Sequence, residues 1–119
     1  MRYAPIKIVD NAAMAAGVVS EAVPLDQVFG LSIQATYVGS GIGGTLSLEC
    51  SNTHQEDNEQ NVIVPGEWVT MSGSVIQLTG PGSYIWNVEA SNYLWVRLVY
   101  SESGEEDAIL NAVCVTKGF

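Results

Sequence analysis

The sequence has a single histidine, His54, and this scarcity argues against histidine-based catalysis. Jelly-roll enzymes of the cupin type hold their metal with a cluster of histidines, and a catalytic triad needs a histidine with suitably placed partners. His54 lies in a polar segment without a second histidine, so we expect it to be a surface residue. The sequence therefore predicts a non-enzymatic protein with no catalytic residue, no metal ligand and no cofactor.

Basic residues are also few, since four Lys and Arg stand against thirteen Asp and Glu and give a formal net charge of −9. Nucleic acids and anionic membranes carry dense negative charge and would repel such a chain. No apolar run reaches the ~18 residues of a membrane-spanning helix, and the start has no apolar region typical of a signal peptide. We therefore expect neither a nucleic-acid nor a membrane partner, and synthesis in the cytoplasm.

Cysteine occurs only twice, at Cys50 and Cys114. Two thiols are too few for a disulfide scaffold, and zinc motifs place cysteines about two to four residues apart. We expect two buried free thiols. The alternative is one bridge between core strands, which requires their Cα atoms to lie within about 7 Å of each other.

Apolar and polar residues alternate along most of the chain, as in β-strands with one buried face. In the segment 44–51 the apolar side chains fall at Leu46, Leu48 and Cys50, and in 29–37 the odd positions are apolar. Glycine, proline and serine separate these segments and supply turns. Further strands are expected at 6–9, 17–20, 68–71, 74–78, 83–88, 93–100 and 108–115.

Eight or nine short strands with regularly spaced turns predict one all-β domain, an antiparallel β-sandwich of the jelly-roll type. Residues 1–24 form an N-terminal arm with the first strands, and residues 25–119 form the sandwich. The one helix-like stretch is 11–17, which Asn11 could cap. The expected core residues are Leu46, Leu48, Cys50, Trp68 and Trp86.

Three loops have compositions that also occur in ligand sites. Residues 39–44 fit the dinucleotide-binding pattern G-x-G-x-x-G, but a strand and not a helix follows, so we expect a hairpin loop. The polar segment 52–61 is predicted to be an exposed loop. The acidic segment 102–107 lacks the alternating oxygen ligands of an EF-hand, which favours a solvated turn over a calcium site.

Two expected strands, 93–100 and 108–115, are apolar on both faces, which indicates that both sides are covered. Arg97 lies in the middle of the first, where it should pair with a carboxylate, stack on an aromatic ring or join a subunit contact. We favour structural pairing over ligand binding. The surplus apolar surface predicts a homo-oligomer, most simply a homotrimer.

A characteristic order of segments extends over roughly residues 29 to 118. It consists of the strand 44–52, Trp68, Ser72-Gly73-Ser74, Trp86-Asn87-Val88, the strand 93–100 and a closing Lys117-Gly118. The series resembles the small β-sandwich virion proteins of tailed bacteriophages, which decorate or cement capsids or form head and tail appendages. The resemblance implies a non-enzymatic structural role in the virion and assembly as trimers or larger rings, with Trp68, Trp86 and Arg97 as structural residues.

On this interpretation the protein is a capsid decoration or cement protein whose partners are further copies of itself and the major capsid protein or neighbouring virion proteins. The candidate interface residues are Arg2, Lys7, Tyr93, Trp95, Arg97 and Lys117. We expect the segment Met1–Val9, with Lys117 and Phe119, to dock while the acidic loops point outward. The alternative is a carbohydrate- or receptor-binding module of a head fibre or tail appendage, in which exposed aromatic residues grip glycans.

Overall fold

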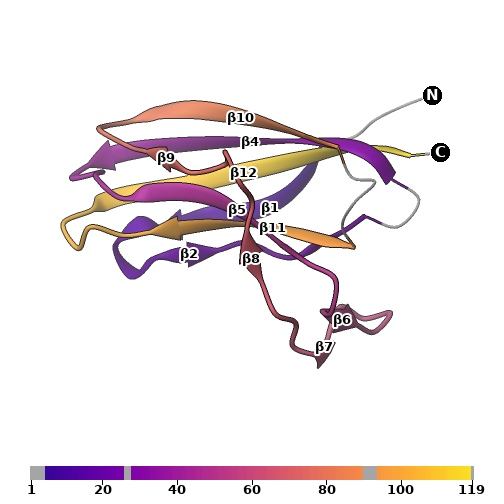
Figure 1. Cartoon of the computed structure of the whole chain (residues 1–119). Helices are drawn as coiled ribbons and strands as arrows, with labels where there is room; N and C mark the ends of the chain where they lie inside the picture. Colours follow the sequence, from indigo (N-terminus) through magenta and orange to yellow (C-terminus); the bar gives the residue numbers. More distant parts are fainter. Residues whose placement is uncertain (1–4, 26–27, 90–93, 119) are drawn as a thin grey trace.

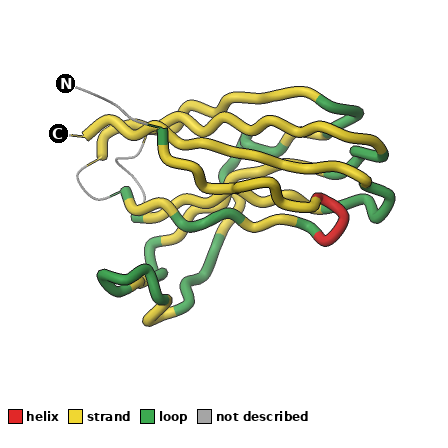
Figure 2. Tube along the Cα trace, turned by 180° about the vertical axis from the view of Figure 1, so that it is seen from behind, coloured by secondary structure: helices red, strands yellow, loops and turns green. Residues whose placement is uncertain are grey.

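Almost the whole chain is β-structure, as Figure 1 and Figure 2 show from opposite sides. The structure, a computed structural model, describes residues 5–25, 28–89 and 94–118. Within these residues it has twelve strands and one turn of 3-10 helix, η1. They are β1 (Ile6–Ala13), η1 (Met14–Ala16), β2 (Val18–Val19), β3 (Val23–Pro24), β4 (Val28–Ser40), β5 (Thr45–Ser51), β6 (Gln55–Glu56), β7 (Val62–Val64), β8 (Val69–Thr70), β9 (Ile76–Gln77), β10 (Gly82–Glu89), β11 (Trp95–Ser101) and β12 (Asp107–Gly118).

Two antiparallel sheets form the layers of a sandwich (Figure 1). One is four-stranded, in the order β1-β12-β4-β10. The other is six-stranded, with the path β2-β11-β5-β8, β3 beside β11 and β9 beside β5. The predicted all-β sandwich is therefore confirmed. In the described part of the chain no helix is long and apolar enough to cross a membrane.

The core lies between the sheets, because the long strands turn alternate apolar side chains inward. From β4, β5 and β11 it contains Leu31, Ile33, Ala35, Tyr37, Leu46, Leu48, Val96, Leu98 and Tyr100. Trp86 joins them from β10 and donates its indole N–H to the Ser74 carbonyl over 2.9 Å. Cys50 is buried as well, whereas Trp68 is only half-buried and lies outside this core, which differs from the expectation.

Both cysteines are free and buried, as predicted. Cys50 lies on β5 and Cys114 on β12, so they belong to different sheets. Burial raises the pKa of Cys114 to about 11 and also raises the pKa of Cys50. Since the thiolate is the reactive form, both side chains act as small apolar core residues at neutral pH.

The N-terminal part of the chain is built into the sandwich and is not a free arm. β1 pairs with β12, and its residues Ile8 and Val9 are each only 5% exposed. β2 and β3 pair with β11 in the other sheet. Deletion of residues 1–9 would therefore remove the first half of the edge strand β1 and two core side chains. Docking by this segment stays a prediction, and it would have to involve a strand of the sandwich.

The helix-like stretch 11–17 forms only one 3-10 turn, with Gly17 as its C-cap, because β1 continues to Ala13. Asn11 has a φ of 49° at a place where the register of β1 against β12 shifts. Its backbone N–H donates to Asn111 Oδ1 over 2.8 Å, and the Asn111 amide donates back to Asn11 Oδ1 over 3.1 Å. Pairing of β1 with β12 thus outweighs the local preference of this segment for a helix.

The glycine-rich segment 39–44 crosses from β4 in one sheet to β5 in the other, so it is not the expected hairpin loop. At its end a Cβ on Gly44 would overlap the Ser101 carbonyl oxygen and the Tyr100 ring. Only glycine therefore allows this crossover to pack against the end of β11.

A buried carboxylate organises the acidic loop 102–107, which begins after β11. Glu106 is 7% exposed and accepts hydrogen bonds from the Tyr100 hydroxyl and from the N–H groups of Ser103 and Gly104. The Tyr100 hydroxyl in turn accepts the Gly44 N–H over 3.0 Å. The expected solvated turn is thus wrong for Glu106, which ties the loop to the crossover between the sheets.

Core packing gives a first prediction. Leu48 is 1% exposed, so Leu48→Ala should leave a cavity and lower the free energy of unfolding by ~2–5 kcal/mol. Val38→Ala is the control, because this side chain is 54% exposed on β4; it should change the free energy by no more than about 0.5 kcal/mol. Urea denaturation measures both. Equal midpoints for the two variants would contradict the assignment of the strand faces.

Glu106 gives a second prediction, on pH dependence. The Tyr100 hydroxyl, helped by the backbone N–H groups, lowers the pKa of Glu106 to about 2 from an ordinary 4.5. Because the unfolded chain binds this proton more readily, the stabilisation is present above pH 4.5 and is lost as the pH falls towards 2. Glu106→Gln should flatten the stability profile in that window. Glu105→Gln, at an exposed neighbour, should keep the wild-type slope; two identical slopes would refute the role of Glu106.

Candidate binding site at the base of an arm

An arm, residues 52–68, leaves the six-stranded sheet after β5 and returns to it at β8 (Figure 1). It carries the two-stranded sheet of β6 and β7 and projects away from the sandwich. The sequence predicts an exposed loop for most of this segment, because strands of two or three residues have no detectable period. The side chains that hold its base also form the candidate site.

Arg97 joins the base of the arm to the sheet. It lies on β11 directly opposite Glu49 on β5, and its Nη2 and Nε are 2.7 and 2.8 Å from Glu49 Oε1. The Trp68 ring covers the guanidinium, whose Cζ is 4.1 Å from the ring centroid. The Arg97 and Glu49 side chains are 26% and 20% exposed, so water screens the pair only partly. Arg97 thus combines two of the partners expected from the sequence, because it pairs with the Glu49 carboxylate and stacks on the Trp68 ring.

His54 is buried between two tryptophans and is not the expected surface residue. It is 7% exposed, and its ring centroid lies 5.1 Å from Trp68 and 4.9 Å from Trp95. Its Nε2 is hydrogen-bonded to Glu56 over 2.8 Å. Its Nδ1 is buried and has no hydrogen-bond partner in the described part of the chain. The two tryptophans, which lie far apart in the sequence, account for this burial.

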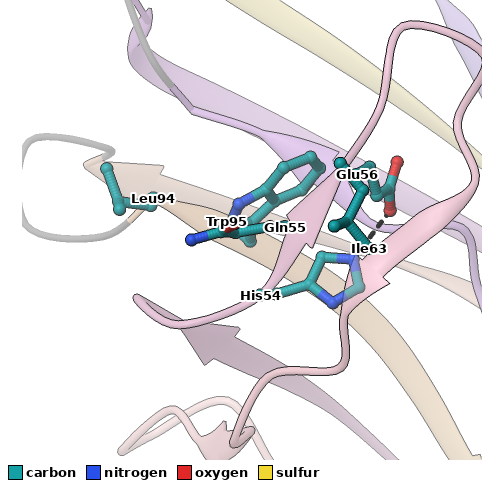
Figure 3. A pocket seen from close by; sticks show the side chains of 6 residues that line it. All are labelled: His54, Gln55, Glu56, Ile63, Leu94 and Trp95. Carbon is teal, nitrogen blue, oxygen red and sulfur yellow. Dashed lines mark hydrogen bonds and ion pairs between the residues drawn. The ribbon is translucent and has the colours of Figure 1, made fainter.

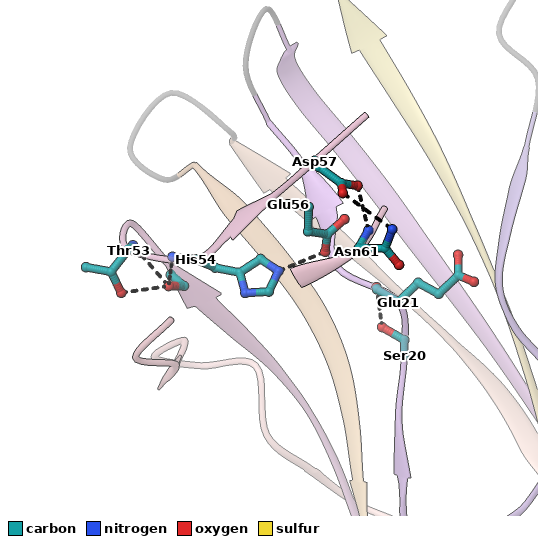
Figure 4. A network of polar contacts seen from close by, with 8 residues as sticks. Ser20, Glu21, Thr53, His54, Glu56, Asp57 and Asn61 are labelled. Atoms are coloured by element: carbon teal, nitrogen blue, oxygen red, sulfur yellow. Dashed lines mark hydrogen bonds and ion pairs between the residues drawn. The ribbon is translucent and has the colours of Figure 1, made fainter. Parts of the chain in front are cut away.

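Backbone hydrogen bonds fix the position of His54, as Figure 4 shows. Ser51 Oγ accepts the N–H groups of Thr53 and His54, each over 3.2 Å. Thr53 Oγ1 accepts the Glu67 N–H over 2.8 Å and so ties the outgoing segment of the arm to the returning one. A Cβ on Gly66 would collide with the His54 backbone, which shows how closely these strands approach. The base of the arm is therefore a rigid joint.

The tip of the arm combines a structured turn with exposed apolar residues. Asp57 Oδ1 accepts the N–H groups of Asn61 and Glu59, each over 2.9 Å, and these bonds lower the pKa of Asp57 (Figure 4). The strand that follows the turn is exposed on both faces. Val62, Ile63 and Val64 are 54%, 60% and 41% exposed. The arm thus holds an apolar strand away from the core.

An open pocket of about 390 Å³ lies between the arm and the start of β11 (Figure 3). Its lining residues are His54, Gln55, Glu56, Ile63, Leu94 and Trp95. An indole and aliphatic side chains form an apolar wall, and an amide and a carboxylate supply hydrogen-bonding groups. Such a lining suits a small polar ligand with an apolar face, for example a sugar ring. Among the described residues, no group of three or more His, Cys, Asp and Glu side chains is placed to hold a metal ion.

The structure describes three of the candidate interface side chains, and these three do not share one surface. Lys7 lies on the edge strand β1, where its Nζ is 3.2 Å from Asp10 Oδ1. Trp95 and Arg97 lie on β11 in the other sheet, beneath the base of the arm. The remaining candidates Arg2 and Tyr93, and the side chain of Lys117, lie outside the described residues.

The sequence analysis missed three residues of this site, namely His54, Glu49 and Glu56. One signal was available for Glu49, because it is the only charged residue on its strand and Arg97 is the only one on the strand beside it. No comparable signal exists for His54. Its burial depends on two tryptophans that the folding of the arm brings together.

Comparisons with known proteins add information on the fold. No protein family model matches the sequence, and no curated protein matches it. The structure is similar to that of the SPBc2 prophage-derived protein YomS, with a TM-score of 0.54 and 9% identity over 96% of this chain and 93% of that one. The coat protein of Tobacco streak virus also matches, with a TM-score of 0.42 and 8% identity over 98% of this chain and 87% of that one. The match to YomS shows a shared fold.

The joint at Arg97 gives a third prediction. A cation–π contact contributes ~0.5–2 kcal/mol, so Trp68→Ala should speed amide exchange across residues 54–67 by ~2–30-fold. Exchange in the central strand β4 should not change. Val69→Ala is the control, because this neighbouring side chain is 65% exposed. Hydrogen–deuterium exchange with mass spectrometry measures the effect. Unchanged exchange of the arm in Trp68→Ala would show that the tryptophan does not hold it.

Proposed function

We propose that the protein is a non-enzymatic structural component of a phage virion, which binds the head surface as an oligomer in the manner of capsid decoration or cement proteins. One observation carries the proposal: the fold matches that of a prophage-derived protein over 96% of this chain and 93% of the other. The order of segments that resembles small virion proteins supports the same role.

The arm is the element best suited to attachment. Its base is fixed by Arg97, Trp68 and His54, so its tip is presented in one orientation. The tip carries the three consecutive exposed residues of β7, which offer an apolar contact to the major capsid protein. Rigid presentation lowers the entropy lost on binding, which favours a stable contact from a small area. The arm thus replaces the N-terminal segment as the proposed docking element.

Purified particles of the phage that encodes the protein test this role. Electron microscopy should locate the wild-type protein on the head, and purified protein should bind again to particles that lack it. Ile63→Asp should reduce this binding at least ~10-fold, because a carboxylate would have to be desolvated in an apolar contact. Val75→Asp, at a side chain 55% exposed and outside the arm, should bind normally. Circular dichroism checks that both variants fold.

Two results would contradict the proposal at different levels. Particles that contain no copy of the protein would remove the virion role altogether. Normal binding of Ile63→Asp would keep the virion role and show that attachment uses another surface.

A second candidate function is a carbohydrate- or receptor-binding module of a head fibre or tail appendage. The pocket beside Trp95 favours it, because an indole flanked by Gln55 and Glu56 offers both a stacking surface and hydrogen-bonding groups. A glycan array separates the two functions. Only the binding module would give signals that Trp95→Ala abolishes.

A further inference from the structure

The four-stranded sheet has two edges, and the edge at β1 is protected against pairing with another strand. The register of β1 against β12 shifts twice, between Lys7 and Val9 and between Val9 and Ala12. Lys7 and Asp10 form an exposed ion pair on this strand. Bulges and charged side chains are means by which proteins keep edge strands from adding a foreign strand.

The opposite edge strand, β10, has no bulge, and its one charged residue is Glu89 at its end. It pairs with β4 residue by residue, from Gly82 opposite Tyr37 to Glu89 opposite Gly30, without a register shift. Residues 82–88 contain no charged residue and no proline. Among the described residues β10 pairs with no strand other than β4, and Figure 1 shows it at the margin of the sheet. A regular strand of eight residues therefore presents a row of unpaired backbone groups.

The surface next to this edge is uncharged. Ile85 is 53% exposed on the outer face of the sheet, in register with Gln34 on β4, which in turn lies opposite Val113 on β12. Charged residues occupy outward positions only at the strand ends, at Glu89, Asp107 and Lys117, and the other outward positions of the three strands are uncharged. They are Ser32, Thr36, Val38, Ser83, Asn87, Ile109, Asn111 and Val115. In a chain with a net charge of −9, this region lacks the charge that would repel a second copy.

We propose that β10 pairs antiparallel with β10 of a second copy and joins the two four-stranded sheets into one continuous sheet. The strand is self-complementary in this arrangement. When the pair is centred on Ile85, that residue lies opposite its own counterpart, and Tyr84 lies opposite Trp86. Aromatic cross-strand pairs are favourable, and Tyr84, which is 41% exposed, has area left to bury. The contact is isologous, because each copy contributes the same strand.

The strand that pairs with β10 comes from a second copy, because both the charge distribution and the strand geometry favour self-association. A strand added to β10 gains backbone hydrogen bonds whatever its source, so specificity must come from side chains and electrostatics. Two molecules that each carry a net charge of −9 repel each other in most orientations. The edge at β10 offers an approach without opposed carboxylates. The contact is twofold, whereas the resemblance to virion proteins implies trimers. The inference does not depend on the virion role.

Sedimentation equilibrium of the full chain tests the contact. The wild-type protein should be a dimer at micromolar concentration. Ile85→Lys places an ammonium group opposite its own copy at the centre of the pair, and it should raise the dissociation constant at least ~10-fold. Val38→Lys is the matched control, because Val38 is 54% exposed on the same outer face but lies on the interior strand β4. It should remain a dimer.

Amide exchange gives a readout at the strand itself. In the wild-type protein, exchange of the peptide 82–89 should slow as the concentration rises, because the free edge of β10 becomes hydrogen-bonded. A protein that stays monomeric up to about 100 µM would overturn the proposal. So would a trimer that Ile85→Lys leaves intact. Dissociation by Val38→Lys as strong as by Ile85→Lys would also overturn it, because the copies would then pack through the outer face. Circular dichroism shows that both variants are folded.

Discussion

Up to Tyr100, both faces of the strand β11 are apolar apart from Arg97 and have to be covered, and the position of the arm depends on how Arg97 is covered. Alternate residues from Val96 to Tyr100 point into the core, so Arg97 faces outward. A partly buried guanidinium needs a carboxylate and shielding from water, which Glu49 and Trp68 supply. Because Trp68 ends the arm, the contact that satisfies Arg97 also fixes the arm. His54 then fits between the tryptophans, and the pocket lies beside this joint.

The distribution of charge separates the roles of loops and strands. Acidic residues gather in the tip of the arm and in the loop after β11, where Glu106 turns inward and fixes the loop. The outer face of the four-stranded sheet is uncharged along the middle of β10, β4 and β12. Repulsion between copies keeps a protein of this charge apart in most orientations. The same repulsion restricts close approach of a second copy to uncharged surfaces, such as the edge at β10.

The long strands could be predicted from the sequence because alternation involves only neighbouring residues. Leu31, Ile33, Ala35 and Tyr37 are buried at the odd positions, as the pattern predicts. The short strands of the arm could not be predicted in this way, since two or three residues have no period. The helix-like stretch 11–17 is reduced to one 3-10 turn, because Asn11 bonds to a residue 100 positions away in the chain. In the site, the sequence predicted that Arg97 needs partners but not which ones.

By itself the sequence determined the all-β class, the inward faces of the long strands and the excess of negative charge. The tertiary structure alone decided that Glu49 and Trp68 satisfy Arg97, that His54 and Glu106 are buried, and that β10 is left at an open edge. The physical reason is the range of the interactions. Strand formation depends on side chains a few residues apart, whereas burial of a polar group depends on distant segments that fold over it.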